Sequence, residues 1–237
     1  MSSTEKKTAG YSSSATRTEQ RRPPGPKNFK EWYLLSYNQV SFFGWFWILF
    51  MTCYTLYLEE GDCKRVFAVV GPGLSYVQTA ALFEVLHSLF GFIKTPLLTT
   101  SLQVASRLFL VWGVNYFVPE IHKHWSFTTM VLAWSIAECV RYIYYIFQLS
   151  GNVLPNFIKN ARYSFFLVLY PLGVFSELTM VYLALPYAKA ISPLYYYALI
   201  TATLLYIPGF PMLFSHMLVQ RRNYLKSVAA KKAKKAH

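Results

Sequence analysis

Six long apolar segments dominate the sequence, and they restrict the chain to one kind of fold. About 20 consecutive apolar residues are enough to cross a bilayer as a helix. Of the 237 residues, 54% are hydrophobic and only 14% are charged, a smaller share of charge than soluble domains have. We therefore predict an all-α membrane protein built as one bundle of six transmembrane helices. The expected spans are residues 40–58, 74–93, 98–118, 127–149, 163–185 and 194–219.

Glycine and proline mark the expected connections between these spans. Both residues favour turns and are poor interior residues of helices. The expected connections contain Gly61, residues 71–73, Pro96, Pro119 and residues 151–155. We therefore expect short loops throughout the bundle.

The two ends of the chain differ in composition from the transmembrane domain expected at residues 31–219. Residues 1–30 are rich in Ser, Thr and charge and lack an apolar run, so we expect a disordered cytosolic tail and no secretory signal. Residues 220–237 form a basic tail that ends in Lys-Lys-Ala-His. Lys234 and Lys235 have the spacing of the dilysine signal that returns membrane proteins to the endoplasmic reticulum, an address and not an anchor. The alternative is a basic tail that only attracts anionic lipid.

Lysine and arginine are distributed unevenly between the two sides of the predicted bundle. An even number of spans places both tails on the same side of the membrane. Each tail carries seven Lys and Arg residues and the short loops on that side add three, against four on the opposite side. Because basic residues gather on the cytosolic side, we expect both termini to be cytosolic. Nucleic-acid binding is a poor explanation for this charge, since no globular domain remains to bind nucleic acid.

Motifs of soluble enzymes and of metal sites are missing from the sequence. Cys53, Cys63 and Cys139 have no partner at metal-ligand or redox-motif spacing. None of them is followed by an arginine six positions later, as the loop of a cysteine phosphatase requires. Serine-nucleophile elbows and glycine-rich phosphate loops are absent as well. The sequence therefore predicts no metal site.

Ionisable residues inside the spans are the remaining candidates for chemistry. Such groups cost about 2.5–3.5 kcal/mol each on insertion scales, so they usually face the bundle interior and often mark function. Glu138 and Arg141 lie three residues apart, which places them on one helix face. Gln103 and Arg107 lie four apart and share a face in the same way. Together with Glu84, these residues form either buried ion pairs that fix helix packing or part of a substrate site.

The fifth expected span contains Tyr170 and Glu177. Seven residues are nearly two helical turns, so both side chains lie on one face, about 10.5 Å apart along the axis. Pro171 removes a backbone donor, and Gly173 lets a ligand or another backbone come close. A phenol and a carboxylate suit proton transfer at a carbon next to a carbonyl, together with protonation of a leaving oxygen. Spacing alone leaves other roles open for this pair.

Three blocks of sequence resemble a known enzyme family. They are LFEVLHSLFGFIKTPLLTTSLQVASRLFLVWGV at 82–114, WSIAECVRYIYY at 134–145 and RYSFFLVLYPLGVFSELTMVY at 162–182. The order and spacing of these blocks resemble those of the very-long-chain (3R)-3-hydroxyacyl-CoA dehydratases of the endoplasmic reticulum, also called the protein tyrosine phosphatase-like family. The resemblance covers about residues 30–220 of this sequence.

This resemblance implies a hydro-lyase of the endoplasmic reticulum membrane that needs no cofactor. The family removes water from a (3R)-3-hydroxyacyl-CoA to give a trans-2-enoyl-CoA, the third of four steps in fatty-acid elongation. Its catalytic Tyr and Glu are seven residues apart in the fifth span, which matches Tyr170 and Glu177. We favour Glu177 as the base and Tyr170 as the acid. The reverse roles stay open, as does a Glu177 that only orients the tyrosine.

The resemblance also implies partners and leaves alternatives. The implied partners are the acyl-CoA substrate, the elongase condensing enzyme, and the ketoacyl- and enoyl-CoA reductases of the same cycle. The CoA phosphates need positive charge, for which Lys94, Lys159 and Arg162 are available on the cytosolic side. Arg107 and Arg141 are the alternative, as residues that line the inner cavity. A small-solute or proton-coupled transporter and a non-catalytic scaffold of the elongation machinery are the rival functions.

Overall fold

The structure is a computed structural model that describes residues 25–93 and 97–236. This part of the chain contains helices and no strand, because a backbone in lipid must satisfy its hydrogen bonds within each segment or a closed barrel. Six helical segments are long and apolar enough to cross a membrane, which confirms the predicted all-α class and the six spans. They are Phe29–Leu58, Cys63–Leu89, Leu97–Asn115, Trp125–Leu149, Phe166–Ile191 and Pro193–Ala230.

Eleven helical elements make up these segments and their connections in the described residues. In chain order they are α1 (Phe29–Leu58), η1 (Cys63–Arg65), α2 (Val66–Ala80), α3 (Leu82–Leu89), α4 (Leu97–Leu108), the π-helical η2 (Phe109–Asn115), η3 (Pro119–Lys123), α5 (Trp125–Leu149), α6 (Asn156–Ser164), α7 (Phe166–Ile191) and α8 (Pro193–Ala236).

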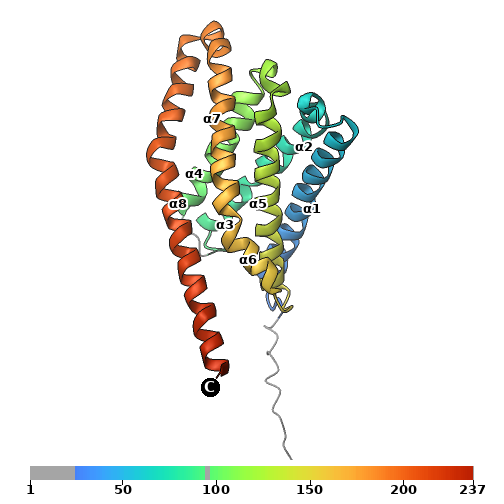
Figure 1. Ribbon diagram of the computed structural model, residues 1–237, viewed down its shortest axis with the longest axis vertical. Helices are drawn as coiled ribbons and strands as arrows, with labels where there is room; N and C mark the ends of the chain where they lie inside the picture. The colour runs from blue at the N-terminus through green and yellow to red at the C-terminus, as the bar shows by residue number, and fades with distance from the viewer. Residues whose placement is uncertain (1–24, 94–96, 237) are drawn as a thin grey trace, which may run out of the picture.

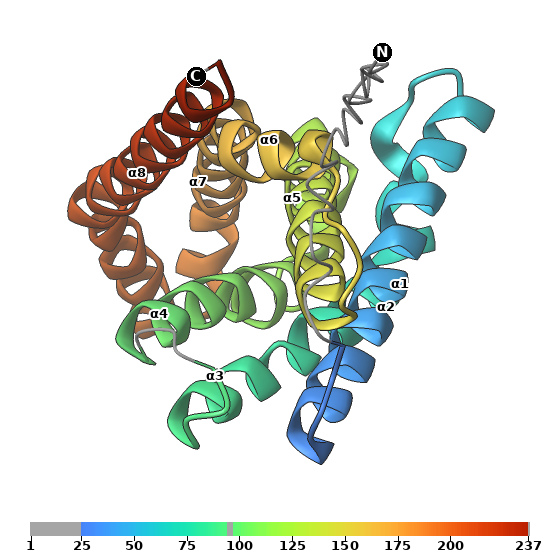
Figure 2. The same cartoon turned by 90° about the horizontal axis from the view of Figure 1, so that it is seen from below.

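Helix α5 occupies the centre of the bundle (Figure 1). Helix α1 packs against one side of α5, α7 packs against another, and α8 packs on α7. Seen from below, α3 and α4 lie between α8 and α1 (Figure 2). The buried apolar core includes Trp45 of α1, Met130 of α5 and Met180 of α7. The central position of α5 places its polar residues within reach of helices on every side.

The connection expected at residues 71–73 is wrong, because these residues lie inside α2. The turn after α1 comes earlier, at Glu60 and Gly61, whose φ angles of 53° and 92° are left-handed. Gly73 serves close helix packing, since a Cβ built there would lie 2.5 Å from the Trp47 ring of α1. Helix α2 therefore begins at Val66, about eight residues before residue 74, where the second span was expected to start.

The two tails expected from composition are only partly described. The predicted N-terminal tail lies mostly outside the described residues, and α1 already begins at Phe29. At the other end, α8 continues through residues 220–236 as helix and extends past the bundle (Figure 1). The side chains of Lys234 and Lys235 lie outside the described part of the structure. Both ends of the helical region leave the bundle at the same end, which also carries α6.

Candidate active site

Glu177 is a buried carboxylate on α7 that is held by two neutral donors. The indole Nε1 of Trp134, on α5, donates a hydrogen bond of 2.8 Å to its Oε1. The hydroxyl of Tyr206, on α8, donates a hydrogen bond of 2.7 Å to its Oε2. Within the described residues, no lysine, arginine or histidine forms a salt bridge with this carboxylate. Three helices therefore fix the position of Glu177 without neutralising its charge.

Tyr170 lies two turns before Glu177 on α7 and also meets α8. Its half-buried ring stacks on Phe210 and Phe214, with centroid distances of 5.1 and 6.1 Å. Within the described part of the chain, its hydroxyl makes no hydrogen bond, to Glu177 or to any other residue. The phenol and the carboxylate thus face the same neighbouring helix, and each remains available to a third group.

Gly173 lies between these two residues and is buried against α5. A Cβ built on Gly173 would lie 3.8 Å from the Ala133 Cβ and 3.9 Å from Oε1 of Glu177. These are ordinary contacts, so a methyl group fits there in the structure. Such a group would nevertheless lie directly beside the carboxylate.

The other charged residues of the spans form one buried ion-pair network. The Arg141 guanidinium donates two hydrogen bonds of 2.7 Å to the two Glu84 oxygens and one of 2.6 Å to Glu138. Arg107 donates to the second Glu138 oxygen at 2.5 Å. The Tyr142 hydroxyl donates to Glu84 at the same distance. The network joins α3, α4 and α5, which agrees with the interpretation of these residues as ion pairs that fix helix packing.

Trp134 connects this network to Glu177. The Arg107 guanidinium lies over the Trp134 ring, 5.1 Å from its centroid, while the indole N–H points to the carboxylate. Gln103, four residues before Arg107, is exposed on α4, and its side chain makes no hydrogen bond within the described residues. The structure thus brings Glu84, Arg107, Glu138 and Arg141 into one network and places Gly173 beside Glu177, whereas Gln103 lies apart from both.

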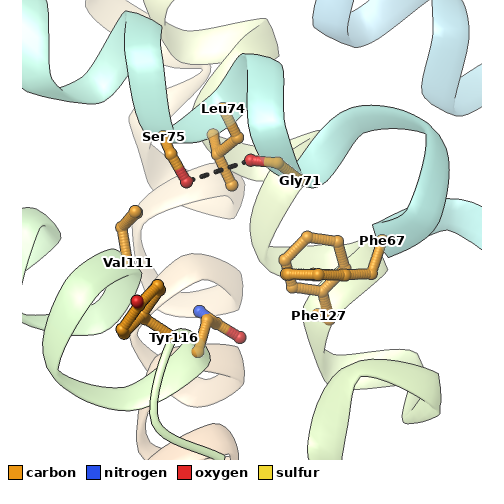
Figure 3. Close-up of a pocket in the computed structure, with 8 residues that line it drawn as sticks. Phe67, Gly71, Leu74, Ser75, Val111, Tyr116 and Phe127 are labelled. Atoms are coloured by element: carbon orange, nitrogen blue, oxygen red, sulfur yellow. Dashed lines mark hydrogen bonds between the residues drawn. The ribbon is translucent and has the colours of Figure 1, made fainter. Parts of the chain in front are cut away.

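A small cavity of about 50 Å³ lies elsewhere in the bundle, between α2, η2 and α5 (Figure 3). Phe67, Val111 and Tyr116 are among the residues that line it. The Asn115 Oδ1 beside it is buried and has no hydrogen-bond partner in the described part of the structure. The cavity is large enough for a water molecule and too small for an acyl chain, and it contains none of the candidate site residues.

Comparison with known proteins places this chain in a family. Residues 78–227 match the family described as protein tyrosine phosphatase-like protein, and this region includes α5, α7 and most of α8. The chain belongs to this family. The resemblance inferred from the three sequence blocks is therefore confirmed.

Several members of the phosphatase-like family are named as dehydratases. PASTICCINO 2A of Oryza sativa, a very-long-chain (3R)-3-hydroxyacyl-CoA dehydratase, is 39% identical over 211 residues, which are 84% of this chain and 95% of the relative. PASTICCINO 2 of Arabidopsis thaliana, of the same named activity, is 37% identical over 207 residues, 81% of this chain and 92% of the relative. The human dehydratase 2 is 39% identical over 206 residues, 81% and 80% of the two chains. No solved structure matches the chain.

Sequence reasoning about this phosphatase-like protein missed Trp134 and Tyr206. Tyr206 comes 29 residues after Glu177, and Trp134 comes 43 residues before it, so no helical spacing relates either residue to the carboxylate. The available signal was the chemistry of each residue. Tyr206 places a hydroxyl group in an apolar stretch of sequence, and Trp134 carries an indole N–H. Both groups need a hydrogen-bond partner when they are buried, and a buried carboxylate can supply one.

Proposed function

We propose that this chain dehydrates very-long-chain (3R)-3-hydroxyacyl-CoA to trans-2-enoyl-CoA, with Tyr170 and Glu177 as the catalytic pair. The names of its relatives support the reaction. The observation that supports the pair is the state of Glu177, a buried carboxylate with neutral donors only, on the same helix as an unbonded phenol. Such a carboxylate is free to accept a proton, because no salt bridge within the described residues holds its charge.

In the proposed reaction, Glu177 takes a proton from C2, which the thioester makes acidic. The C2–H electrons form the C2=C3 double bond as the C3–O bond breaks. Tyr170 gives its proton to the departing hydroxyl, which leaves as water, and the proton on Glu177 then restores the phenol. Trp134 and Tyr206 act as positioning residues that aim the carboxylate. The reaction is redox-neutral.

We further propose that the enzyme is a multi-pass protein of the endoplasmic reticulum membrane with both termini cytosolic. The excess of lysine and arginine in the two tails supports this orientation. The dilysine spacing of Lys234 and Lys235 supports the compartment. The proposed partners are the ketoacyl-CoA reductase, which makes the substrate, the enoyl-CoA reductase, which consumes the product, and the elongase condensing enzyme of the same cycle.

Turnover of a long-chain (3R)-3-hydroxyacyl-CoA by the purified protein in detergent tests this proposal. The wild-type protein should form the trans-2-enoyl-CoA, and Tyr170→Phe should lower turnover by at least about 10²-fold, the usual effect of a positioned acid–base group. Tyr182→Phe is the matched control, since Tyr182 is an exposed tyrosine on the same helix. A folded Tyr170→Phe variant with normal turnover would show that this tyrosine is not catalytic. An inactive wild-type protein would reject the reaction itself.

A further inference from the structure

A second, polar pocket opens at the end of the bundle where the first and last described helices, α1 and α8, leave it. It is bounded by α5, α6 and α8 and has a volume of about 560 Å³. This volume falls within the roughly 300–1,000 Å³ of small-molecule sites. Its wall is rich in tyrosine and amide side chains and includes Tyr144, Tyr145, Arg162, Tyr163, Asn223 and Tyr224.

Flat aromatic faces and one guanidinium dominate this pocket. The rings of Tyr163 and Tyr224 stack with a centroid distance of 4.4 Å, which ties α6 to α8. The Arg162 guanidinium lies 5.7 and 5.6 Å from the ring centroids of Tyr144 and Tyr145. It also donates one long hydrogen bond, of 3.3 Å, to the Tyr145 hydroxyl. Arginine held against aromatic rings is well placed to bind phosphate with its remaining N–H groups.

The positive charge of Arg162 is not balanced by a nearby carboxylate in the described part of the chain. Arg107 and Arg141 both pair with glutamates, whereas Arg162 has no salt bridge in the described part of the chain. The sequence contains no Asp or Glu at residues 139–176 or 178–237, and every residue that lines the pocket comes from these two stretches. An anionic ligand would supply the missing negative charge.

The pocket lies at a suitable distance from the proposed catalytic pair. Tyr206 contacts Glu177, and Gln220 lines the pocket, and both residues belong to α8. Fourteen residues of helix separate them, which is about 21 Å. The Tyr170, Phe210 and Phe214 rings stack between these two levels of α7 and α8. The phosphopantetheine arm of CoA is an extended chain of comparable reach.

We propose that the pocket between α5, α6 and α8 binds the nucleotide portion of acyl-CoA. The adenine ring lies against the tyrosine faces, the phosphates bind Arg162, and the pantetheine arm follows the α7–α8 contact to Glu177. This inference rests on the proposed dehydratase function. An anionic phospholipid headgroup shares the phosphate but has no flat ring for the aromatic faces, so the tyrosines favour the nucleotide.

Kinetic constants measured with two substrates test the site. The first substrate is the (3R)-3-hydroxyacyl-CoA, and the second carries the same acyl group as a pantetheine thioester, which lacks the nucleotide. Arg162→Gln should raise KM for the CoA thioester about tenfold, the effect of one lost charge-assisted hydrogen bond. It should leave kcat for this substrate and both constants for the pantetheine thioester unchanged. Parallel changes for both substrates, or no change for either, would overturn the proposal.

A second variant adds a carboxylate to the pocket without disturbing a buried residue. Asn223 is exposed, so Asn223→Glu should fold and should repel the phosphates, again raising KM for the CoA thioester only. Asn152→Glu is its matched control, because Asn152 is exposed in the α5–α6 connection and does not line the pocket. Equal effects of the two substitutions would indicate a general charge effect and would reject the site.

Direct binding separates the nucleotide from a lipid and the pocket from the reaction. CoA without an acyl chain should bind the wild-type protein and lose affinity in Arg162→Gln. If CoA binding is unchanged while binding to phosphatidylserine in mixed micelles weakens, the pocket is a lipid site and the proposal is wrong. If the wild-type protein turns over neither thioester, the dehydratase function fails, which differs from a failure of the pocket alone.

Discussion

Two glutamates of this bundle are buried to a similar degree, but one accepts hydrogen bonds from charged donors and the other from neutral donors. Glu138 and Glu177 expose only 4% and 7% of their surface. Glu138 accepts hydrogen bonds from the guanidinium groups of Arg107 and Arg141, whereas Glu177 accepts them from an indole and a phenol. Burial alone therefore does not decide what a carboxylate does in a membrane helix. Its donors decide whether the charge is fixed or free to take up a proton.

Glu177→Gln gives the largest expected change in turnover. The amide keeps the shape of the side chain, and the Tyr206 hydroxyl can turn to accept from it, so the fold should persist. Turnover of the hydroxyacyl-CoA should fall by at least about 10²-fold because the proton acceptor is gone. Glu120→Gln, at an exposed position, is the control. Normal turnover in the folded variant would make Glu177 structural and would remove its contrast with Glu138.

Glu138→Gln, the same substitution in the network, should mainly reduce stability. Within the described residues, Arg107 then loses its only carboxylate and Arg141 keeps Glu84 alone, and breaking a buried pair costs about 3–5 kcal/mol. The melting temperature in detergent should drop clearly, and activity should be lost together with the folded fraction. A stable Glu138→Gln protein that is nevertheless inactive would place Glu138 in the chemistry.

Tyr206→Phe should have a smaller and more selective effect. It removes one hydrogen bond to Glu177 and keeps the ring. The carboxylate is then held less firmly in its orientation, so kcat should fall about tenfold. KM and the melting temperature should hardly change, which separates a positioning role from a packing role. Tyr197→Phe, at an exposed tyrosine of the same helix, should be silent. A matching loss of stability would show that Tyr206 only packs α8 on α7.

Gly173→Ala should have the smallest effect of the series. The added methyl meets only ordinary contacts, so the melting temperature should stay near that of the wild-type protein. It would nevertheless lie 3.9 Å from Oε1 of Glu177, the atom that the proposed reaction brings close to the substrate. We expect a several-fold loss of kcat/KM measured with the hydroxyacyl-CoA. An equal loss in Ala133→Gly, which opens the same contact, would argue against crowding as the cause.

The sequence predicted the spans well because apolar length is a local property that the bilayer fixes. Helical periodicity is local as well, and it predicted that Glu138 and Arg141 share one face of α5, where they form a hydrogen bond. The catalytic role of Tyr170 and Glu177, which both lie on α7, stays a prediction. Sequence reasoning misplaced the start of the second span, since Gly73 acts through contact with Trp47 of another helix, which no local pattern contains. It also missed Trp134 and Tyr206 as the donors to Glu177, because only the packing of α5, α7 and α8 brings these residues together.

The single residue between α7 and α8, Ser192, has a consequence for the order in which the molecule assembles. It closes a helical hairpin in which Glu177 and Tyr206 meet over 29 residues of chain, whereas Glu84 and Arg141 meet over 57. The short separation lowers the chain entropy lost when this hairpin closes, but synthesis proceeds from the N-terminus, so α3, α4 and α5 are made before α7 and α8. The ion-pair network can therefore form while the last spans are still being made. Glu177 acquires its tyrosine donor only when the final hairpin closes, so among Glu84, Glu138 and Glu177 it is the last to gain all its hydrogen bonds.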